Sequence, residues 1–174
     1  MDSLKGPDAA ASVVYRKPTL ADAAAVHTLI QRCGELDVNS RYAYLLLCRD
    51  FAETCAIAEL EREPVGFASG YLKPSDPSVL FIWQVAVSPD ARGFGVGKGL
   101  LREVLGRPAC DRVEQMEATI TPSNQASWAL FHSLARERGA LCARSLAFRV
   151  QDFGGQQHEE EHLLRIGPIE ERRE

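Results

Sequence analysis

The stretch LFIWQVAVSPDARGFGVGKGLLREVL, Leu80–Leu105, decides the fold. Its first eight residues are apolar apart from Gln84 and rich in β-branched and aromatic types, which predicts a strand buried on both faces. The segment Ser-Pro-Asp at 88–90 breaks the apolar run and predicts a turn. After a run of alternate glycines, apolar residues recur at helical spacing as far as Leu105. The stretch therefore predicts a strand, a glycine-rich turn and a helix in succession.

The glycine-rich turn is suited to an anion, because the first amides of a helix lack an intrahelical acceptor and glycines let a phosphate approach the backbone. A nucleoside-triphosphate loop requires glycine at position 92 and serine or threonine at position 99, where this chain has Arg92 and Gly99. A dinucleotide loop requires a final glycine where Lys98 and Leu100 stand. The spacing thus excludes both. The residues that we predict to line the anion site are Arg92, Gly93, Phe94, Gly95, Val96, Gly97 and Lys98.

The composition indicates one ordinary soluble domain. The chain has 174 residues, 45% of them hydrophobic and 25% charged, with a formal net charge of -4. The acidic balance argues against nucleic acid as the main partner, and no apolar run reaches the length of a membrane span. Five cysteines without a Cys-x-x-Cys pair favour neither a disulfide framework nor a thiolate metal site, which indicates a reducing compartment. We predict a mobile tail over 1–12, a domain over 13–168 and a charged tail over 169–174.

The other segments predict further strands and helices around the central unit. Alternating or apolar runs predict strands, and apolar stripes between a capping residue and a glycine predict helices. We expect a hairpin turn at 61–64, a loop at 73–77 and a flexible turn at 153–157. The expected strands are 13–17, 54–60, 65–72, 80–87, 112–120, 142–150 and 162–166, and the expected helices are 19–33, 40–51, one ending at 105, and 126–139.

The motif Arg-x-x-Gly-x-Gly at 92–97, after a buried strand, resembles the signature of the GCN5-related N-acetyltransferases, which holds the pyrophosphate of acetyl-coenzyme A. The expected order of elements over 13–168 is similar to the fold of that family. The resemblance implies an α/β (α+β) fold, with a mixed and mostly antiparallel central sheet flanked by helices. It also implies that Asn124 lies near the pantetheine arm of the cofactor. The tyrosine that often protonates the leaving thiolate follows seven residues later in the family, whereas this chain has Phe131.

Several strings outside the glycine turn resemble one family of that superfamily, the L-2,4-diaminobutyrate acetyltransferases. This resemblance implies transfer of an acetyl group from acetyl-coenzyme A to the γ-amine of L-2,4-diaminobutyrate, on the way to the osmolyte ectoine. It further implies a cytoplasmic homodimer with no metal requirement. The strings are Leu36–Ser40 (LDVNS), Tyr44–Cys48 (YLLLC), Phe81–Val87 (FIWQVAV), Glu117–Thr119 (EAT) with Thr121–Asn124 (TPSN), and Gly154–Gly155 (GG) with His158–Glu161 (HEEE).

Acetylation of an amine needs a carboxylate, because a side-chain amine with a pKa near 10 is almost wholly protonated at neutral pH. The carboxylate binds the ammonium and accepts a proton from it. Glu117 is the first candidate for base or amine binder, since it shares a strand face with Thr119 beside the glycine turn. The alternative is a salt-bridged strand carboxylate. A backbone N–H near Val85 is a candidate for stabilising the oxyanion, and Val85 and Val87 are candidates for pairing with the pantetheine amides.

Other polar residues are further candidates for the substrate site. Asp37 is a further candidate to bind the ammonium and accept its proton, and a turn residue is the alternative. The acidic cluster Glu159–Glu161 is a further candidate to bind the ammonium and accept its proton, with Glu159 and Glu160 as substrate contacts, and an exposed charged face is the alternative. His158 is a candidate substrate contact or proton relay, and a surface histidine is the alternative.

Trp83 and Gln84 are notable in the central strand. Trp83 is a candidate wall of the substrate pocket, through ring packing or a cation–π contact, and core packing is the alternative. Gln84 is polar within a buried run and therefore needs a hydrogen-bond partner.

The segment His-Glu-Glu-Glu-His at 158–162 matches the zinc pattern His-Glu-x-x-His. That chemistry requires a helix, whereas glycines precede this segment and a strand-like pattern follows it. On an extended segment the two rings would lie roughly 13 Å apart, too far to share a metal. We therefore predict no metal site.

Two alternatives to diaminobutyrate acetylation stay open from the sequence. The first is the same chemistry on another amine, such as a different diamino acid, a polyamine or a protein N-terminus. The second is a coenzyme A binding sensor that has lost catalysis, which the phenylalanine at position 131 favours.

Overall fold

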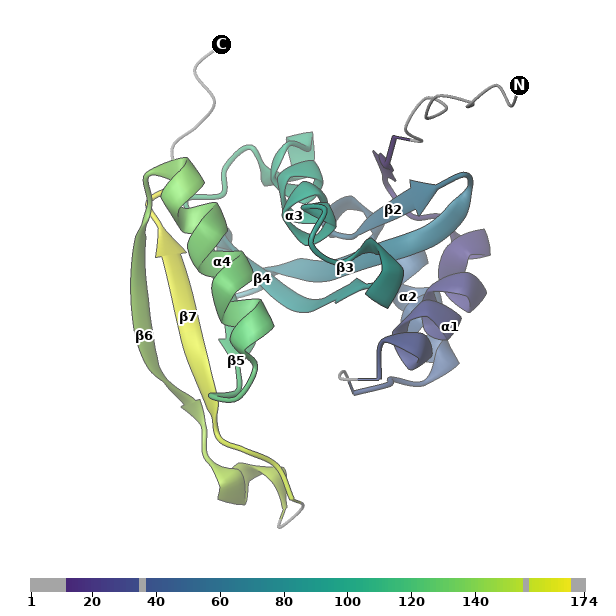
Figure 1. Cartoon of the computed structure of the whole chain (residues 1–174). Coiled ribbons are helices and arrows are strands. Elements are labelled where there is room, and N and C mark those ends of the chain that lie inside the picture. The colour runs from purple at the N-terminus through teal and green to yellow at the C-terminus, as the bar shows by residue number, and fades with distance from the viewer. Residues whose placement is uncertain (1–11, 35–36, 155–156, 170–174) are drawn as a thin grey trace, which may run out of the picture.

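A computed structural model of the chain describes residues 12–34, 37–154 and 157–169 (Figure 1). The predicted tails over 1–12 and 169–174 lie outside the described residues, apart from Ser12 and Ile169. The strands are β1 (Val14–Arg16), β2 (Ala56–Leu60), β3 (Glu63–Lys73), β4 (Asp76–Val87), β5 (Gln115–Ile120), β6 (Leu141–Phe148) and β7 (Glu161–Gly167). The α-helices are α1 (Ala23–Cys33), α2 (Arg41–Arg49), α3 (Val96–Leu105) and α4 (Gln125–Arg138).

The strands form a seven-stranded sheet in the order β1-β2-β3-β4-β5-β7-β6. Neighbouring strands are antiparallel except β4 and β5, which run parallel. This is the mixed, mostly antiparallel sheet that the family resemblance implies. The parallel pairing extends only from Val79 to Ile82 on β4, although β4 continues to Val87. Figure 1 shows the consequence: the half of the sheet with β2, β3 and β4 diverges from the half with β5, β6 and β7.

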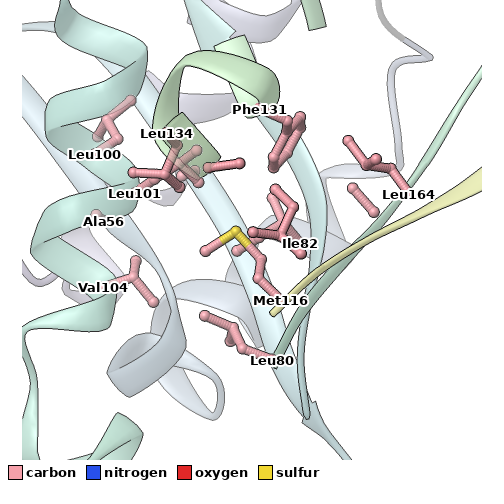
Figure 2. Packing of buried hydrophobic residues seen from close by; sticks show 14 of the residues in the cluster. Ala56, Leu80, Ile82, Leu100, Leu101, Val104, Met116, Phe131, Leu134 and Leu164 are labelled. Carbon is pink, nitrogen blue, oxygen red and sulfur yellow. The ribbon is translucent and has the colours of Figure 1, made fainter. Parts of the chain in front are cut away.

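Helices cover both faces of the half of the sheet with β2, β3 and β4. Side chains of β2 point alternately to the two faces: Ile57 packs in the core with α1 and α2, whereas Ala56 and Ala58 pack in the core with α3 and α4. Figure 2 shows the core formed with α3 and α4, in which Leu100 of α3 and Met116 of β5 are fully buried. The apolar helix that the sequence predicts after the glycine turn is therefore α3. Within the described ranges, every helix is too short or too polar to span a lipid bilayer.

The central strand has a β-bulge at Trp83. Across the β3–β4 ladder, Ser69 pairs with Gln84 and Gly70 with Ile82, so Trp83 is an extra residue on β4. The bulge reverses the side-chain alternation: Ile82 packs in the core with α3 and α4, whereas Gln84 contacts Tyr44 of α2. No local pattern in the sequence indicates this bulge.

The two hairpin turns are tighter than the sequence predicts. Between β2 and β3, only Glu61 and Arg62 leave the ladder, with φ of 51° and 70°. This fits a two-residue hairpin turn, so the predicted hairpin is present with a shorter connection than 61–64. Between β3 and β4, Lys73 pairs with Asp76, and the connection is a short turn instead of a loop over 73–77.

The end of β6 also differs from the prediction of a strand to residue 150. The strand ends at Phe148, and Val150–Phe153 form a short 3-10 helix, η5. The cause is local, because the Asp152 carboxylate accepts the backbone N–H of Arg149 at 2.8 Å and closes a helical turn. Part of the predicted flexible turn at 153–157 lies outside the described residues, namely 155 and 156.

A partly buried ion pair joins β1 to the start of α1. The Arg16 guanidinium donates to both oxygens of Asp22 at 2.8 Å, and Asp22 also accepts the backbone N–H of Thr19 at 2.6 Å. These hydrogen bonds, Arg16 first, outweigh the effect of burial and lower the pKa of Asp22 to about 2. Because the folded pKa lies below the usual 3.8, this stabilisation is present above about pH 4 and is lost as the pH falls toward 2.

We expect Asp22→Asn to lower the free energy of unfolding at pH 7 by about 1–2 kcal/mol, since it removes charge-assisted hydrogen bonds at a partly exposed site. The variant should also lose less stability than the wild type between pH 4 and pH 2. Urea unfolding monitored by circular dichroism at both pH values measures the two effects. Asp50→Asn, at the exposed end of α2, is the control that should leave the urea midpoint unchanged.

Candidate active site

Two cavities meet where β4 and β5 separate. The loop cavity, of about 490 Å³, lies between the end of β4, the glycine turn and one face of α4. The polar cavity, of about 340 Å³, lies between β4, β5, the start of β7 and the segment between α1 and α2. Val85, Asn124 and Ser127 line both cavities. The separated strands therefore create a space in which two ligands can touch.

The glycine turn gives the loop cavity its shape. Gly93 and Gly95 have φ of 82° and 78°, and α3 begins directly afterwards at Val96. Such values disfavour residues with a Cβ, so these glycines allow the chain to turn and the first amides of α3 to border the cavity. Of the predicted anion-site residues, Arg92, Gly93, Gly95, Val96, Gly97 and Lys98 line the loop cavity, whereas Phe94 is exposed and does not.

The two cations of the turn also make contacts within the protein. The Arg92 guanidinium donates to the carbonyls of Val87, at 3.2 Å, and Cys33, at 3.4 Å, and so ties the turn to β4 and α1. The Lys98 ammonium lies 3.1 Å from the Ser133 hydroxyl and 3.3 Å from a carboxylate oxygen of Glu137, both on α4. Both cations therefore hold the walls of the loop cavity together as well as giving it positive charge.

The polar cavity brings together acidic and basic side chains from distant segments. The Nε2 atom of His158 lies 4.0 Å from the carboxylate of Asp37 and 3.7 Å from that of Glu161. Asp37 comes from the segment between α1 and α2, and the other two come from the start of β7. Stacking on Phe153, with 3.8 Å between ring centroids, fixes the His158 ring. This arrangement places two carboxylates beside one imidazole in the polar cavity, which suits an ammonium group.

Gln84 holds the Asp37 segment against the sheet. Its side-chain Nε2 donates to the Asp37 carbonyl at 2.8 Å, and its Oε1 accepts from the Tyr44 hydroxyl at 3.3 Å. The backbone N–H of Asn39 donates to the same hydroxyl at 3.4 Å. The bulge at Trp83 makes this possible, because it directs Gln84 toward α2 and leaves Trp83 exposed on the wall of the polar cavity.

Glu117 does not line either cavity. Its side chain is only 1% exposed, and its two oxygens lie 2.8 Å from the Lys73 ammonium and 2.6 Å from the Arg165 guanidinium. Burial raises the pKa of Glu117, but the hydrogen bonds from Lys73 and Arg165 outweigh it and lower the pKa overall. A carboxylate that is saturated by two cations is poorly placed to bind a substrate ammonium. The structure therefore favours the alternative of a salt-bridged strand carboxylate.

The other predicted substrate contacts divide in two. Thr119, Trp83, Asp37 and His158 all line the polar cavity, whereas Glu159 and Glu160 do not. Glu159 accepts from the backbone N–H of Ser123 at 3.3 Å and from its hydroxyl. Glu160 lies 2.7 Å from the Nε2 atom of His162. These contacts direct both glutamates away from the cavity.

Glu161 is the member of the acidic cluster 159–161 that lines the polar cavity, whereas the sequence singled out Glu159 and Glu160 as substrate contacts. In β7, Leu164 and Ile166 face the core, so Glu161, Leu163 and Arg165 lie on the opposite face. Thr119 pairs with Leu163, which places Glu161 on the same face as Thr119. Strand alternation alone would have separated Glu161 from Glu160 but not from Glu159, so the pairing of β7 with β5 was needed to identify Glu161.

The His-x-x-x-His segment at 158–162 is not helical, because residues 158–160 form no regular element and β7 begins at Glu161. His158 faces the polar cavity, whereas His162 contacts Arg144 of β6, at 3.1 Å, and Glu160. Among the described residues, no group of three or more histidine, cysteine, aspartate or glutamate side chains is placed to hold a metal.

Comparison with known protein families identifies the family to which this fold belongs. Residues 23–135 match the Acetyltransferase (GNAT) family. The chain belongs to this family. The mixed sheet with its separated β4 and β5 strands is thus the GNAT fold, and the fold that the sequence resemblance implied is confirmed.

Several relatives with one name are similar over almost the whole chain. The L-2,4-diaminobutyric acid acetyltransferase of Bordetella parapertussis is 47% identical over 168 residues, which cover 96% of this chain and 90% of that protein. The protein of the same name from Chromohalobacter salexigens is 47% identical over 161 residues, covering 91% and 83%.

A solved structure gives the same result. The diaminobutyrate acetyltransferase EctA from Paenibacillus lautus, in complex with its substrate L-2,4-diaminobutyric acid and coenzyme A, superimposes with a TM-score of 0.89 at 40% sequence identity. The match covers 92% of this chain and 97% of that one. The predicted resemblance to the diaminobutyrate acetyltransferases is confirmed.

Proposed function

We propose that this chain is an acetyl-coenzyme A dependent L-2,4-diaminobutyrate N-γ-acetyltransferase. The observation that carries the proposal is the contact between the two cavities at Val85, Asn124 and Ser127. One cavity ends in a glycine turn suited to a diphosphate, and the other contains two carboxylates suited to a diamine. The relatives named above support the proposal, since each is named a diaminobutyrate acetyltransferase.

The loop cavity fits the elongated shape of acetyl-coenzyme A. The amides at the start of α3 and the charges of Arg92 and Lys98 would bind the pyrophosphate. The part of β4 beyond Ile82 is not paired with β5, so Val85 and Val87 would pair with the pantetheine amides like an added strand. Asn124, at the junction of the cavities, borders the end of that arm. These assignments place the thioester at the junction.

The polar cavity fits a diamino acid with two ammonium groups. Asp37 is 95% exposed at its side chain and would attract the cation at the cavity mouth. Glu161 is only 20% exposed, so its charge is less screened, and we assign it the role of base. His158 lies between the two carboxylates and Trp83 forms part of the wall, which together limit the size of the amine.

The proposed reaction is direct attack of the amine on the thioester, without a covalent enzyme intermediate. Glu161 accepts one proton from the γ-ammonium and passes it to solvent, which leaves a neutral nucleophile. The nitrogen then attacks the carbonyl carbon, and a backbone N–H near Val85 stabilises the oxyanion. Holding both substrates at one junction removes most of the entropic cost of bringing them together.

We expect Asp37→Asn to raise the KM for diaminobutyrate by about 3–10-fold, because one attractive charge is lost at an exposed site. The KM for acetyl-coenzyme A should stay unchanged, since Asp37 does not line the loop cavity. Steady-state kinetics with each substrate varied in turn gives both values. An unchanged KM for the amine would remove Asp37 from the substrate site.

We further propose that the protein is a cytoplasmic homodimer whose product feeds ectoine synthesis. The edge strand β6 supports the dimer, because it exposes three large apolar residues: Leu141, Leu146 and Phe148. Analytical ultracentrifugation would test the oligomeric state.

Thiol release from acetyl-coenzyme A with L-2,4-diaminobutyrate, L-ornithine, L-lysine and spermidine tests the proposed function. We expect diaminobutyrate to have the highest kcat/KM. Preference for another amine would move the substrate assignment to that amine. Cofactor binding without turnover of any amine would indicate the coenzyme A sensor instead.

A further inference from the structure

The proposed reaction ends with a thiolate that must gain a proton, and position 131 cannot supply it. Collapse of the tetrahedral intermediate breaks the carbon–sulfur bond and leaves the sulfur of coenzyme A with a negative charge. The side chain of Phe131 is buried on the wall of the polar cavity and carries no proton donor. Another group at the junction of the cavities must therefore act, provided that the proposed function holds.

Ser127 lies one helical turn before Phe131 on the same face of α4. It lines both cavities, as do Val85 and Asn124. Among these junction residues, Val85 has no polar side-chain atom, and Asn124 uses its side-chain oxygen to accept the Ser127 backbone N–H at 3.0 Å. An amide can donate a hydrogen bond but does not exchange its proton readily. Ser127 is thus the junction side chain with a hydroxyl.

The surroundings of the Ser127 hydroxyl suit a proton relay. Across the described residues, the hydroxyl makes no hydrogen bond to another protein group, whereas the backbone N–H of the same residue is held by Asn124. The backbone is fixed and the hydroxyl is available to a ligand. Ser127 also lies in the first turn of α4, where the partial positive charge of the helix terminus stabilises a developing thiolate.

We propose that the Ser127 hydroxyl relays the proton that the leaving thiolate receives. The attacking nitrogen, after forming the carbon–nitrogen bond, still carries one proton more than the amide product. As the carbon–sulfur bond breaks, Ser127 gives its hydroxyl proton to the sulfur and takes the surplus proton from the nitrogen. The two transfers are coupled, because a free serine alkoxide is too basic to persist beside a thiol. The serine is regenerated, and coenzyme A leaves as the thiol.

The test compares the wild type with Ser127→Ala, Ser127→Thr and the double variant Ser127→Ala/Phe131→Tyr. We expect Ser127→Ala to lower kcat by about 10–100-fold with both KM values within about twofold, since the role concerns a step after binding. Ser127→Thr keeps a hydroxyl at this position, and Ser127→Ala/Phe131→Tyr supplies one a helical turn later, so both variants should retain much of the kcat that Ser127→Ala loses. Ser78→Ala, whose hydroxyl contacts Asp76 outside both cavities, is the matched control and should keep normal turnover.

The results separate this proposal from the proposed function. Normal wild-type turnover of diaminobutyrate together with an unaffected Ser127→Ala variant would overturn the serine relay alone. A loss in Ser127→Ala that neither returned hydroxyl restores would also overturn it, because the loss would then reflect packing. A wild type that binds acetyl-coenzyme A but acetylates no amine would overturn both proposals.

Discussion

Replacing Glu161 by glutamine is expected to lower kcat by about 10²–10⁴-fold, the usual contribution of a general base. The glutamine keeps the shape of the side chain but cannot accept the proton, so the substrate stays an ammonium and does not attack. The KM for acetyl-coenzyme A should be unchanged, because Glu161 lines the polar cavity only. Stopped assays of thiol release at saturating substrates, with cofactor binding measured by calorimetry, give both quantities.

Two other glutamates, Glu160 and Glu117, provide matched controls for Glu161→Gln. Glu160→Gln changes a carboxylate that pairs with His162 outside the cavity and should keep nearly normal kcat. Glu117→Gln should lower the stability, because it leaves the Lys73 and Arg165 charges without their shared carboxylate, while the folded protein keeps its turnover. If Glu161→Gln retained kcat within about threefold, or if Glu117→Gln lost turnover without losing stability, the base would have to be reassigned.

Replacing Arg107 by alanine is expected to lower the free energy of unfolding by about 3–5 kcal/mol. The residue is 8% exposed, and its guanidinium donates to the backbone carbonyls of Ala52, at 2.9 Å, of Glu53, at 3.2 Å, and of Cys55. Without the guanidinium these carbonyls lose a charged donor in a largely buried site, although the Ala52 carbonyl keeps the backbone N–H of Cys55 at 3.3 Å. The short helix η2 (Ala52–Thr54) also loses its anchor to the segment after α3. The melting temperature should fall by about 10 °C.

Urea unfolding with far-ultraviolet circular dichroism measures the effect of Arg107→Ala. Arg112→Ala, at an exposed position five residues later, is the control and should unfold like the wild type. A loss below about 1 kcal/mol for Arg107→Ala would show that water replaces the guanidinium at these carbonyls and that the anchor is dispensable.

The sequence predicts the fold well because its strongest signals are local. The apolar run to Val87, the alternate glycines and the helical stripe that follows describe one strand, one turn and one helix, and each is present. The bulge at Trp83 and the point where β4 leaves β5 depend on which strands become neighbours. A single sequence does not encode those long-range pairings in any local pattern.

The candidate site was predictable only in part for the same reason. Strand alternation correctly places Glu117 and Thr119 on one face, but Lys73 and Arg165 reach Glu117 from distant positions in the chain. Charge pairing across strands therefore decides which carboxylate is free. Glu161 gains its place from the pairing of β7 with β5, which no spacing within the acidic cluster reveals.

The position of the acetyl group on the product tests the account most directly. Incubation of the protein with acetyl-coenzyme A and L-2,4-diaminobutyrate, followed by tandem mass spectrometry, distinguishes N-γ-acetylated from N-α-acetylated product. We predict the N-γ-acetyl product alone. In the proposed complex the γ-amine contacts the thioester where the two cavities join, at Val85, Asn124 and Ser127. Acetylation of the α-amine, or no acetylated product despite bound cofactor, would contradict the account.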